Sequence, residues 1–205
     1  MSRLKLSYFD IDGGRGGAAR LAMLIGEIPF EDDRIPLAQW PAVKEQMPFH
    51  AVPVLEVDGR RLTQSNTINR YVGKLSGLYP EDPWQAALCD EVMDLLEDIS
   101  TTVVATFKIA DEEAKKAARE AIVNGPLTLL LNNLEAFLRA RDGGYFCDNR
   151  LTIADLRVYI WLKTLFSGTL DYIPTDLVQQ QAPGLLAYYE KIGNHPKVAA
   201  YFAGE

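Results

Sequence analysis

The chain has 205 residues, 48% of them hydrophobic and 24% charged, so it can bury a sizeable core as one large domain or two small ones. Its formal net charge of -7 opposes binding to nucleic acids, whose phosphates attract basic surfaces. No apolar run is long enough for a signal peptide or a membrane-spanning helix, so we expect no membrane partner and a cytoplasmic location. Cys89 and Cys147 stand far apart with only two histidines in the chain, which indicates neither a disulfide framework nor a metal site.

The first 35 residues predict a β-α-β unit. Apolar and polar residues alternate from Leu4 to Tyr8, which predicts a strand with Tyr8 at its end. Small and apolar residues then recur at helical spacing over 16–25, and 30–35 has the pattern of a second strand. Residues 14–17 include three glycines, but these lack the Gly-x-Gly-x-x-Gly spacing of a dinucleotide-binding turn, so we reject that function.

The segment 37–47 is predicted to be irregular and partly helical. Trp40 and Lys44 are four residues apart, so they would share one face of a helix. One indole N–H and one ammonium group on that face could hold a carboxylate. The residues alone are also consistent with no ligand-binding role, in which a half-buried tryptophan simply lies beside a solvated lysine.

The stretch 51–66 offers two kinds of ligand contact. Pro53 forces the residue before it to be extended, and the strand that follows turns at Asp58-Gly59 into a second strand. The helix that begins near Ser65 then presents free N–H groups, which favour a carboxylate. A peptide with an acidic end fits both features. The alternative is a solvated hairpin followed by an ordinary capped helix.

The order of these elements predicts an N-terminal thioredoxin-like α/β domain over 1–77. In such a layer the proline before the third strand is usually cis and exposes backbone to a ligand. Residues 78–83 are predicted to be a linker, with Pro83 at the first position of the next helix.

The remainder, 84–205, predicts an all-helical bundle domain. A long helix runs from Trp84 to about Phe107, and a second over 112–140 is interrupted near Pro126. Thr152 to Asp155 has the signature of a capping box, and two shorter helices are predicted over 185–193 and 196–202.

Several of these signals occur together in the order typical of one family. They are Tyr8-Phe9, Arg15 before Arg20, Trp40-Pro41 with Lys44, Val52-Pro53-Val54-Leu55, Asp58-Gly59, Gln64-Ser65, and Thr152 to Asp155. Over nearly the whole chain this series resembles the cytosolic glutathione S-transferases, and it is most similar to the sigma class of the Tyr-type enzymes. The resemblance implies a glutathione site in the first domain, an electrophile pocket supplied by the helical domain, and a homodimer.

The resemblance also implies a role for each residue in the series. Tyr8 and Arg15 would act at the thiol. The residues that would bind the rest of glutathione are Gln64 and Ser65 for the γ-glutamyl group, Val52 beside Pro53 for the cysteinyl unit, and Trp40 with Lys44 for the glycyl carboxylate. Asp98 of the partner subunit would face the γ-glutamyl amine, and the candidates for the electrophile pocket are Phe9, Thr106 and Phe107.

This chain departs from the sigma pattern at three points. The loop between Tyr8 and Arg15 is longer and richer in glycine, and Gly17 stands where an acidic residue is common. Phe49, four residues before Pro53, occupies the place where several related classes have an aromatic dimer key. The direction of Arg15 and the nature of the dimer contact therefore stay open.

The implied chemistry has a physical basis. A free thiol with a pKa near 8.5 is only a few per cent thiolate at neutral pH, so the site must favour the thiolate. The Tyr8 hydroxyl, protonated at neutral pH, would donate a hydrogen bond to it, and Arg15 with the N-terminus of the first helix would add positive potential. A Ser-type mechanism is not supported, because 10–14 contains no hydroxyl and Ser7 points to the opposite strand face. The alternative for Tyr8 is a core aromatic at a strand end.

We therefore expect a glutathione transferase of the detoxification type, which conjugates the glutathione thiol to small hydrophobic electrophiles. Glutathione would be the cosubstrate, with no metal or other cofactor. One alternative is a glutathione-dependent isomerase of the sigma-class prostaglandin D synthase type. The other is a non-catalytic binding or structural protein, such as the lens crystallins derived from this family.

Overall fold

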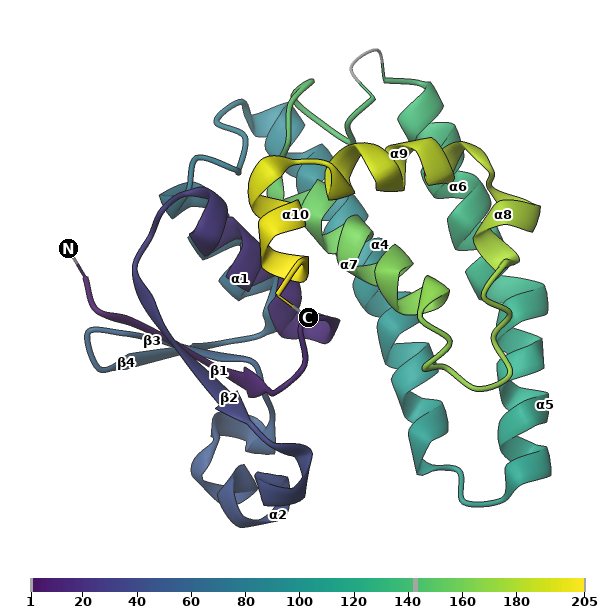
Figure 1. The fold of residues 1–205 in the computed structure, drawn as a ribbon, viewed down its shortest axis with the longest axis horizontal. Helices are drawn as coiled ribbons and strands as arrows, with labels where there is room; N and C mark the ends of the chain where they lie inside the picture. The colour runs from purple at the N-terminus through teal and green to yellow at the C-terminus, as the bar shows by residue number, and fades with distance from the viewer. Residues whose placement is uncertain (1, 142–143, 205) are drawn as a thin grey trace.

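The computed structural model describes residues 2–141 and 144–204. A small four-stranded sheet forms one side of the molecule, and a larger set of helices forms the other (Figure 1). The strand order is β2-β1-β3-β4, with β1 parallel to β2 and the other neighbouring pairs antiparallel. The strands are β1 (Leu4–Phe9), β2 (Phe30–Ile35), β3 (Val54–Val57) and β4 (Arg60–Thr63).

The two faces of β1 have different partners, as the alternation in its sequence predicts. Leu4 and Leu6 are buried in the core, where Leu6 lies opposite Leu55 of β3. Ser7 instead donates a hydrogen bond of 2.6 Å to the Asp33 side chain of β2. Its hydroxyl therefore lies on the face away from Tyr8.

The helices α1 (Gly14–Ile25) and α3 (Ser65–Leu75) lie between the sheet and the helical domain. A short helical segment connects β2 with β3 and comprises α2 (Trp40–Val43) and the 3-10 turns Leu37–Gln39, Lys44–Gln46 and Pro48–His50. Contacts between α3 and α4 join the two parts of the chain. Asn66 donates to Asp94 at 2.7 Å, and Arg70 forms an ion pair with Asp90 at 2.7 Å.

The helical domain is built around α7, whose apolar side chains are almost all buried. Thr152 and Asp155 form the predicted capping box at its start, and the Asp155 carboxylate also accepts from Tyr188 at 2.9 Å. The helices are α4 (Pro83–Ala105), α5 (Glu112–Ile122), α6 (Thr128–Arg139), α7 (Ile153–Phe166), α8 (Leu177–Gln181), α9 (Gly184–Gly193) and α10 (Pro196–Phe202). In the described part of the chain, no helix is long and apolar enough to cross a membrane.

The structure confirms the interruption predicted near Pro126. A π-helical turn, Val123–Leu127, separates α5 from α6, and Gly125 within it has non-helical dihedral angles. Proline lacks the N–H that a continuous helix needs at this position. The predicted long helix over 84–107 ends slightly early, because a 3-10 turn, Thr106–Lys108, follows α4.

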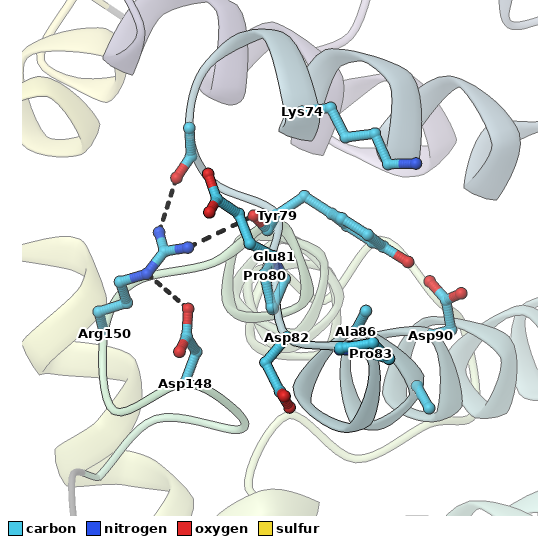
Figure 2. Close-up of a pocket in the computed structure, with 12 residues that line it drawn as sticks. Lys74, Tyr79, Pro80, Glu81, Asp82, Pro83, Ala86, Asp90, Asp148 and Arg150 are labelled. Carbon is cyan, nitrogen blue, oxygen red and sulfur yellow. Dashed lines mark hydrogen bonds and ion pairs between the residues drawn. The ribbon is translucent and has the colours of Figure 1, made fainter.

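Arg150 fixes the connection between α3 and α4 (Figure 2). Its guanidinium donates to the carbonyl oxygens of Gly77 at 2.6 Å and Tyr79 at 3.4 Å, and to the Asp148 carboxylate at 2.7 Å. These residues border a polar cavity of about 980 Å³. The cavity lies beside the connection and shares no lining residue with the smaller cavity described next.

Candidate active site

A cavity of about 230 Å³ lies where the segment before β3, the start of α3 and the middle of α4 meet. Five of the residues assigned to glutathione by resemblance line it, and so does a carboxylate that was not assigned. The lining residues are Arg15, Pro48, Phe49, Ala51, Val52, Pro53, Thr63, Gln64, Ser65 and Glu97. The cavity therefore brings together residues that are up to 82 positions apart in the sequence.

The backbone on one side of this cavity has two unusual conformations. The Val52–Pro53 peptide bond is cis, as expected for a thioredoxin-like layer. Gln64 has a φ of 69°, which is uncommon for a residue other than glycine, and the turn it makes leads directly into α3. The start of α3, at Ser65, thus borders the cavity, and the first N–H groups of a helix suit a carboxylate.

Tyr8 lies at the end of β1 and is 6% exposed. Its hydroxyl oxygen accepts a hydrogen bond of 2.9 Å from the backbone N–H of Arg15, a bond that does not use the phenol's own hydrogen. Burial raises the pKa of Tyr8 above its ordinary value, although the Arg15 N–H and the nearby arginines act in the opposite direction. Tyr8 therefore stays protonated at neutral pH and can donate.

Gly14 and Gly16, in the first turn of α1, allow this helix to lie close to the Tyr8 ring. A Cβ on Gly14 would lie 2.5 Å from the Tyr8 hydroxyl oxygen, and a Cβ on Gly16 would lie 2.5 Å from the ring. Both distances are far inside van der Waals contact. The richness in glycine that departs from the sigma pattern thus serves the approach of α1 to Tyr8.

Arg15 points toward α4, which resolves the direction that the sequence left open. Its Nε donates to Oε1 of Glu97 at 2.8 Å, and its Nη2 donates to the Thr101 hydroxyl at 3.1 Å. The guanidinium is about a quarter exposed. Arg15 therefore lines the cavity while its charge is shared with a carboxylate of the helical domain.

Glu97 is the residue of the site that sequence reasoning missed. It accepts from the Ser65 hydroxyl at 3.1 Å and from the buried Arg157 at 3.3 Å, in addition to Arg15. Burial acts to raise its pKa, but Arg15, Arg157 and Ser65 outweigh that effect and hold the pKa below its ordinary value. The sequence marks Glu97 only by its position at the edge of the apolar stripe of α4. There it lies one helical turn before Thr101, the second partner of Arg15.

Trp40 and Lys44 do not line this cavity. The Lys44 N–H donates to the Trp40 carbonyl, so the two residues are one helical turn apart as predicted. The Trp40 ring packs edge-on against Phe9, with 5.2 Å between ring centroids, and Lys44 is exposed. Their proposed role at a glycyl carboxylate stays a prediction.

The three candidates for the electrophile pocket lie in different surroundings. Phe9 lies between Tyr8 and Trp40, and Phe107 is 56% exposed in the 3-10 turn that follows α4. Thr106 is buried; its hydroxyl donates to the Val103 carbonyl and accepts from Arg119 at 2.9 Å. The Thr106 side chain is thus directed into the protein.

The two residues that the resemblance associates with a dimer are exposed. Asp98 lies on α4 next to Glu97, but on an outward face, and the Phe49 side chain is 81% exposed. Phe49 also has a φ of 55°, a conformation that is strained for a bulky residue.

Tyr8 does not itself line the cavity, but its hydroxyl is hydrogen-bonded to Arg15, which does. The fold and the site define a class of two-domain proteins in which a thioredoxin-like layer places a cis-proline segment and a helix N-terminus at a cavity, with a strand-end tyrosine nearby. Residues 97–205 match the family model described as "Glutathione S-transferase, C-terminal domain". The chain is 31% identical over 206 residues to glutathione S-transferase 1 of Ascaris suum. The aligned region covers 99% of this chain and 97% of that protein. The chain therefore belongs to the glutathione S-transferase family.

Solved structures agree along the whole chain. The structure of prostaglandin synthase D of Nilaparvata lugens matches with a TM-score of 0.87 and 29% identity, covering 98% of this chain and 97% of that one. A glutathione S-transferase of the hookworm Necator americanus, described as monomeric, matches with a TM-score of 0.80 and 28% identity, covering 99% and 97%.

Proposed function

We propose that the chain catalyses addition of the glutathione thiol to small hydrophobic electrophiles. The observation that carries this proposal is the pairing of Tyr8 with Arg15, in which the buried phenol oxygen accepts the Arg15 N–H. That bond polarises the phenol and leaves its own hydrogen to donate to a ligand. A thiolate placed there gains a hydrogen bond together with the positive potential of the α1 N-terminus and the Arg15 side chain.

We further propose that glutathione lies along the 230 Å³ cavity. The Ser65 hydroxyl already donates to Glu97, so it is not the donor expected for the ligand. The γ-glutamyl carboxylate of glutathione would instead accept from the backbone N–H groups of Gln64 and Ser65. The cysteinyl unit would pair with the Val52 backbone beside Pro53, and the glycyl carboxylate would reach Trp40 and Lys44. In this scheme glutathione is the cosubstrate and no metal or other cofactor takes part.

Calorimetric titration with glutathione, followed by a conjugation assay with a panel of small electrophiles, tests the proposal. We expect glutathione to bind and at least one electrophile to be conjugated. Binding without conjugation would support a non-catalytic member of the family, and absence of binding would contradict the assigned cavity.

Glutathione-dependent isomerisation is a second candidate function, because the structure of prostaglandin synthase D of Nilaparvata lugens matches 98% of this chain. The two reactions share the activated thiolate and differ in whether the thiol stays attached to the product. Product analysis with an endoperoxide substrate separates them. A product that retains the glutathionyl group indicates conjugation, and release of free glutathione indicates isomerisation.

We also propose that the chain forms a homodimer in the cytoplasm. The support is the strained, exposed Phe49 and the exposed Asp98 on α4, both close to the cavity. In the dimer, Asp98 of the partner subunit would face the γ-glutamyl amine. Analytical ultracentrifugation measures the number of subunits directly.

A further inference from the structure

The C-terminal helix α10 packs beside α1 (Figure 1). At the C-terminal end of α1, the Lys197 ammonium donates to the Leu24 and Ile25 carbonyls at 3.4 and 3.2 Å and pairs with Glu27 at 2.6 Å. At the other end, the Tyr201 hydroxyl reaches the loop that precedes α1. The last helix of the chain thus spans the helix whose first turn carries Arg15.

Three side chains meet at the loop, and one of them, Arg34, also pairs with Asp32 at 2.7 Å and with Asp10 at 3.3 Å. The Tyr201 hydroxyl donates to Asp12 Oδ1 at 2.7 Å and accepts from Arg34 Nη2 at 2.9 Å. Arg34 Nη2 also donates to Asp12 Oδ1 at 2.6 Å. Each member of the group therefore contacts the other two, and hydrogen bonds to charged partners are among the stronger ones in proteins.

The other contacts that hold this loop lie in its first half, where the Asp10 N–H donates to the Ile35 carbonyl at 3.0 Å and the Asp10 carboxylate pairs with Arg34 at 3.3 Å. The buried Arg20 donates to the Ile11 and Phe9 carbonyls, which fixes the first half of the loop. The second half runs through Gly13 and Gly14, which have no side chains to pack. The Asp12 side chain is therefore the last polar anchor before the Arg15 N–H, three residues later, which donates to Tyr8.

We propose that Tyr201 is a positioning residue for this site. Through Asp12 it sets the path of the glycine loop, and thereby the direction of the Arg15 N–H toward the Tyr8 oxygen. The proposal rests on the proposed function for its catalytic consequence. Its structural part, that α10 orders the loop, can be tested without glutathione.

The test variant is Tyr201→Phe, which removes the hydroxyl and keeps the ring that packs on Phe202 with 4.8 Å between ring centroids. The matched control is Lys197→Met, which removes the contact of α10 with the far end of α1. Hydrogen exchange of the peptide covering 10–16 reports on the loop in the free protein. The ultraviolet titration of bound glutathione and the separate kcat and KM values report on the site.

In Tyr201→Phe we expect exchange over 10–16 to rise about tenfold, kcat to fall by about three- to tenfold, and the bound thiol pKa to rise, with KM for glutathione changed by less than about twofold. Lys197→Met should leave all four quantities close to wild type. Asp12→Asn, which keeps the shape of the side chain, should reproduce the effects of Tyr201→Phe, and the double variant should be no worse than either single one.

Unchanged exchange over 10–16 in a folded Tyr201→Phe protein would overturn the proposal, as would equal effects in Lys197→Met. If Tyr201→Phe fails to fold, the same readouts on Asp12→Asn decide. A wild-type protein that binds no glutathione would contradict the proposed function, while the exchange data would still show whether Tyr201 orders the loop.

Discussion

At the scale of single residues, Tyr8 is the most informative position, because its hydroxyl oxygen accepts from the Arg15 N–H while its own hydrogen can donate to a ligand. Tyr8→Phe keeps the ring under α1 and removes the donor. We expect the pKa of the bound glutathione thiol to rise by about 1 to 2 units and kcat to fall, with little loss of glutathione affinity. Ultraviolet titration of the bound thiolate measures the shift; an unchanged pKa and rate would exclude Tyr8 as the activating group.

Gly16 provides a second test at this scale. In Gly16→Ala the new methyl group would collide with the Tyr8 ring, so either the ring or the start of α1 must move. We expect a loss of stability of about 1 to 3 kcal/mol together with a fall in kcat. Gly193→Ala is the control, because its Cβ would make ordinary contacts with Tyr159. Chemical denaturation and steady-state kinetics give both quantities, and normal behaviour of Gly16→Ala would mean that the loop does not need to approach Tyr8 so closely.

At the scale of the elements, Glu97 joins α4 to α1 and α3, and its effect should depend on pH. Its pKa in the folded protein lies below the ordinary value of 4.5, so its contribution to stability is present above that value and is lost as the pH falls through the folded pKa. We expect Glu97→Gln to be less stable than wild type at neutral pH and the difference to shrink below about pH 4.

Denaturant titrations of both proteins between neutral and acidic pH measure this difference. Glu91→Gln on the same helix is the control, because Glu91 is half exposed and lies 3.8 Å from Arg141. Its substitution should change stability little throughout. A difference between wild type and Glu97→Gln that stays constant down to the lowest pH would show that Glu97 is not stabilised as a carboxylate.

At the scale of the whole molecule, the proposed dimer makes each site depend on two chains, with Tyr8 from one and Asp98 of the partner subunit from the other. Tyr8→Phe and Asp98→Lys homodimers should both be impaired, the second through repulsion of the γ-glutamyl ammonium. After subunit exchange, one site of each heterodimer collects both defects and the other collects neither, so about a quarter of all sites should be native. The mixture should then exceed the activity of either parent.

Mass spectrometry verifies the exchange. If subunits exchange and activity is only the average of the two parents, Asp98 does not act across the interface. A protein that sediments as a monomer at all concentrations would contradict the dimer itself.

The sequence alone determined the local elements and their order. Each local signal acts over a few residues, so its effect can be predicted from spacing and residue type. These signals are the alternation in β1, the helix-breaking Pro126, the capping box at Thr152 and the proline before β3. The same holds for the candidate site residues around Val52 and Ser65, which lie within one continuous stretch and do line one cavity.

The tertiary structure decided what lies opposite these elements. Glu97 joins the site only because α4 packs beside α3, and its charge is held by Arg15 and Arg157 from distant parts of the chain. The link from Tyr201 to Asp12 likewise depends on α10 packing against α1. A sequence pattern specifies which face of a helix is apolar, but the partner of a polar side chain is set by how the helices pack, and that depends on the whole core at once.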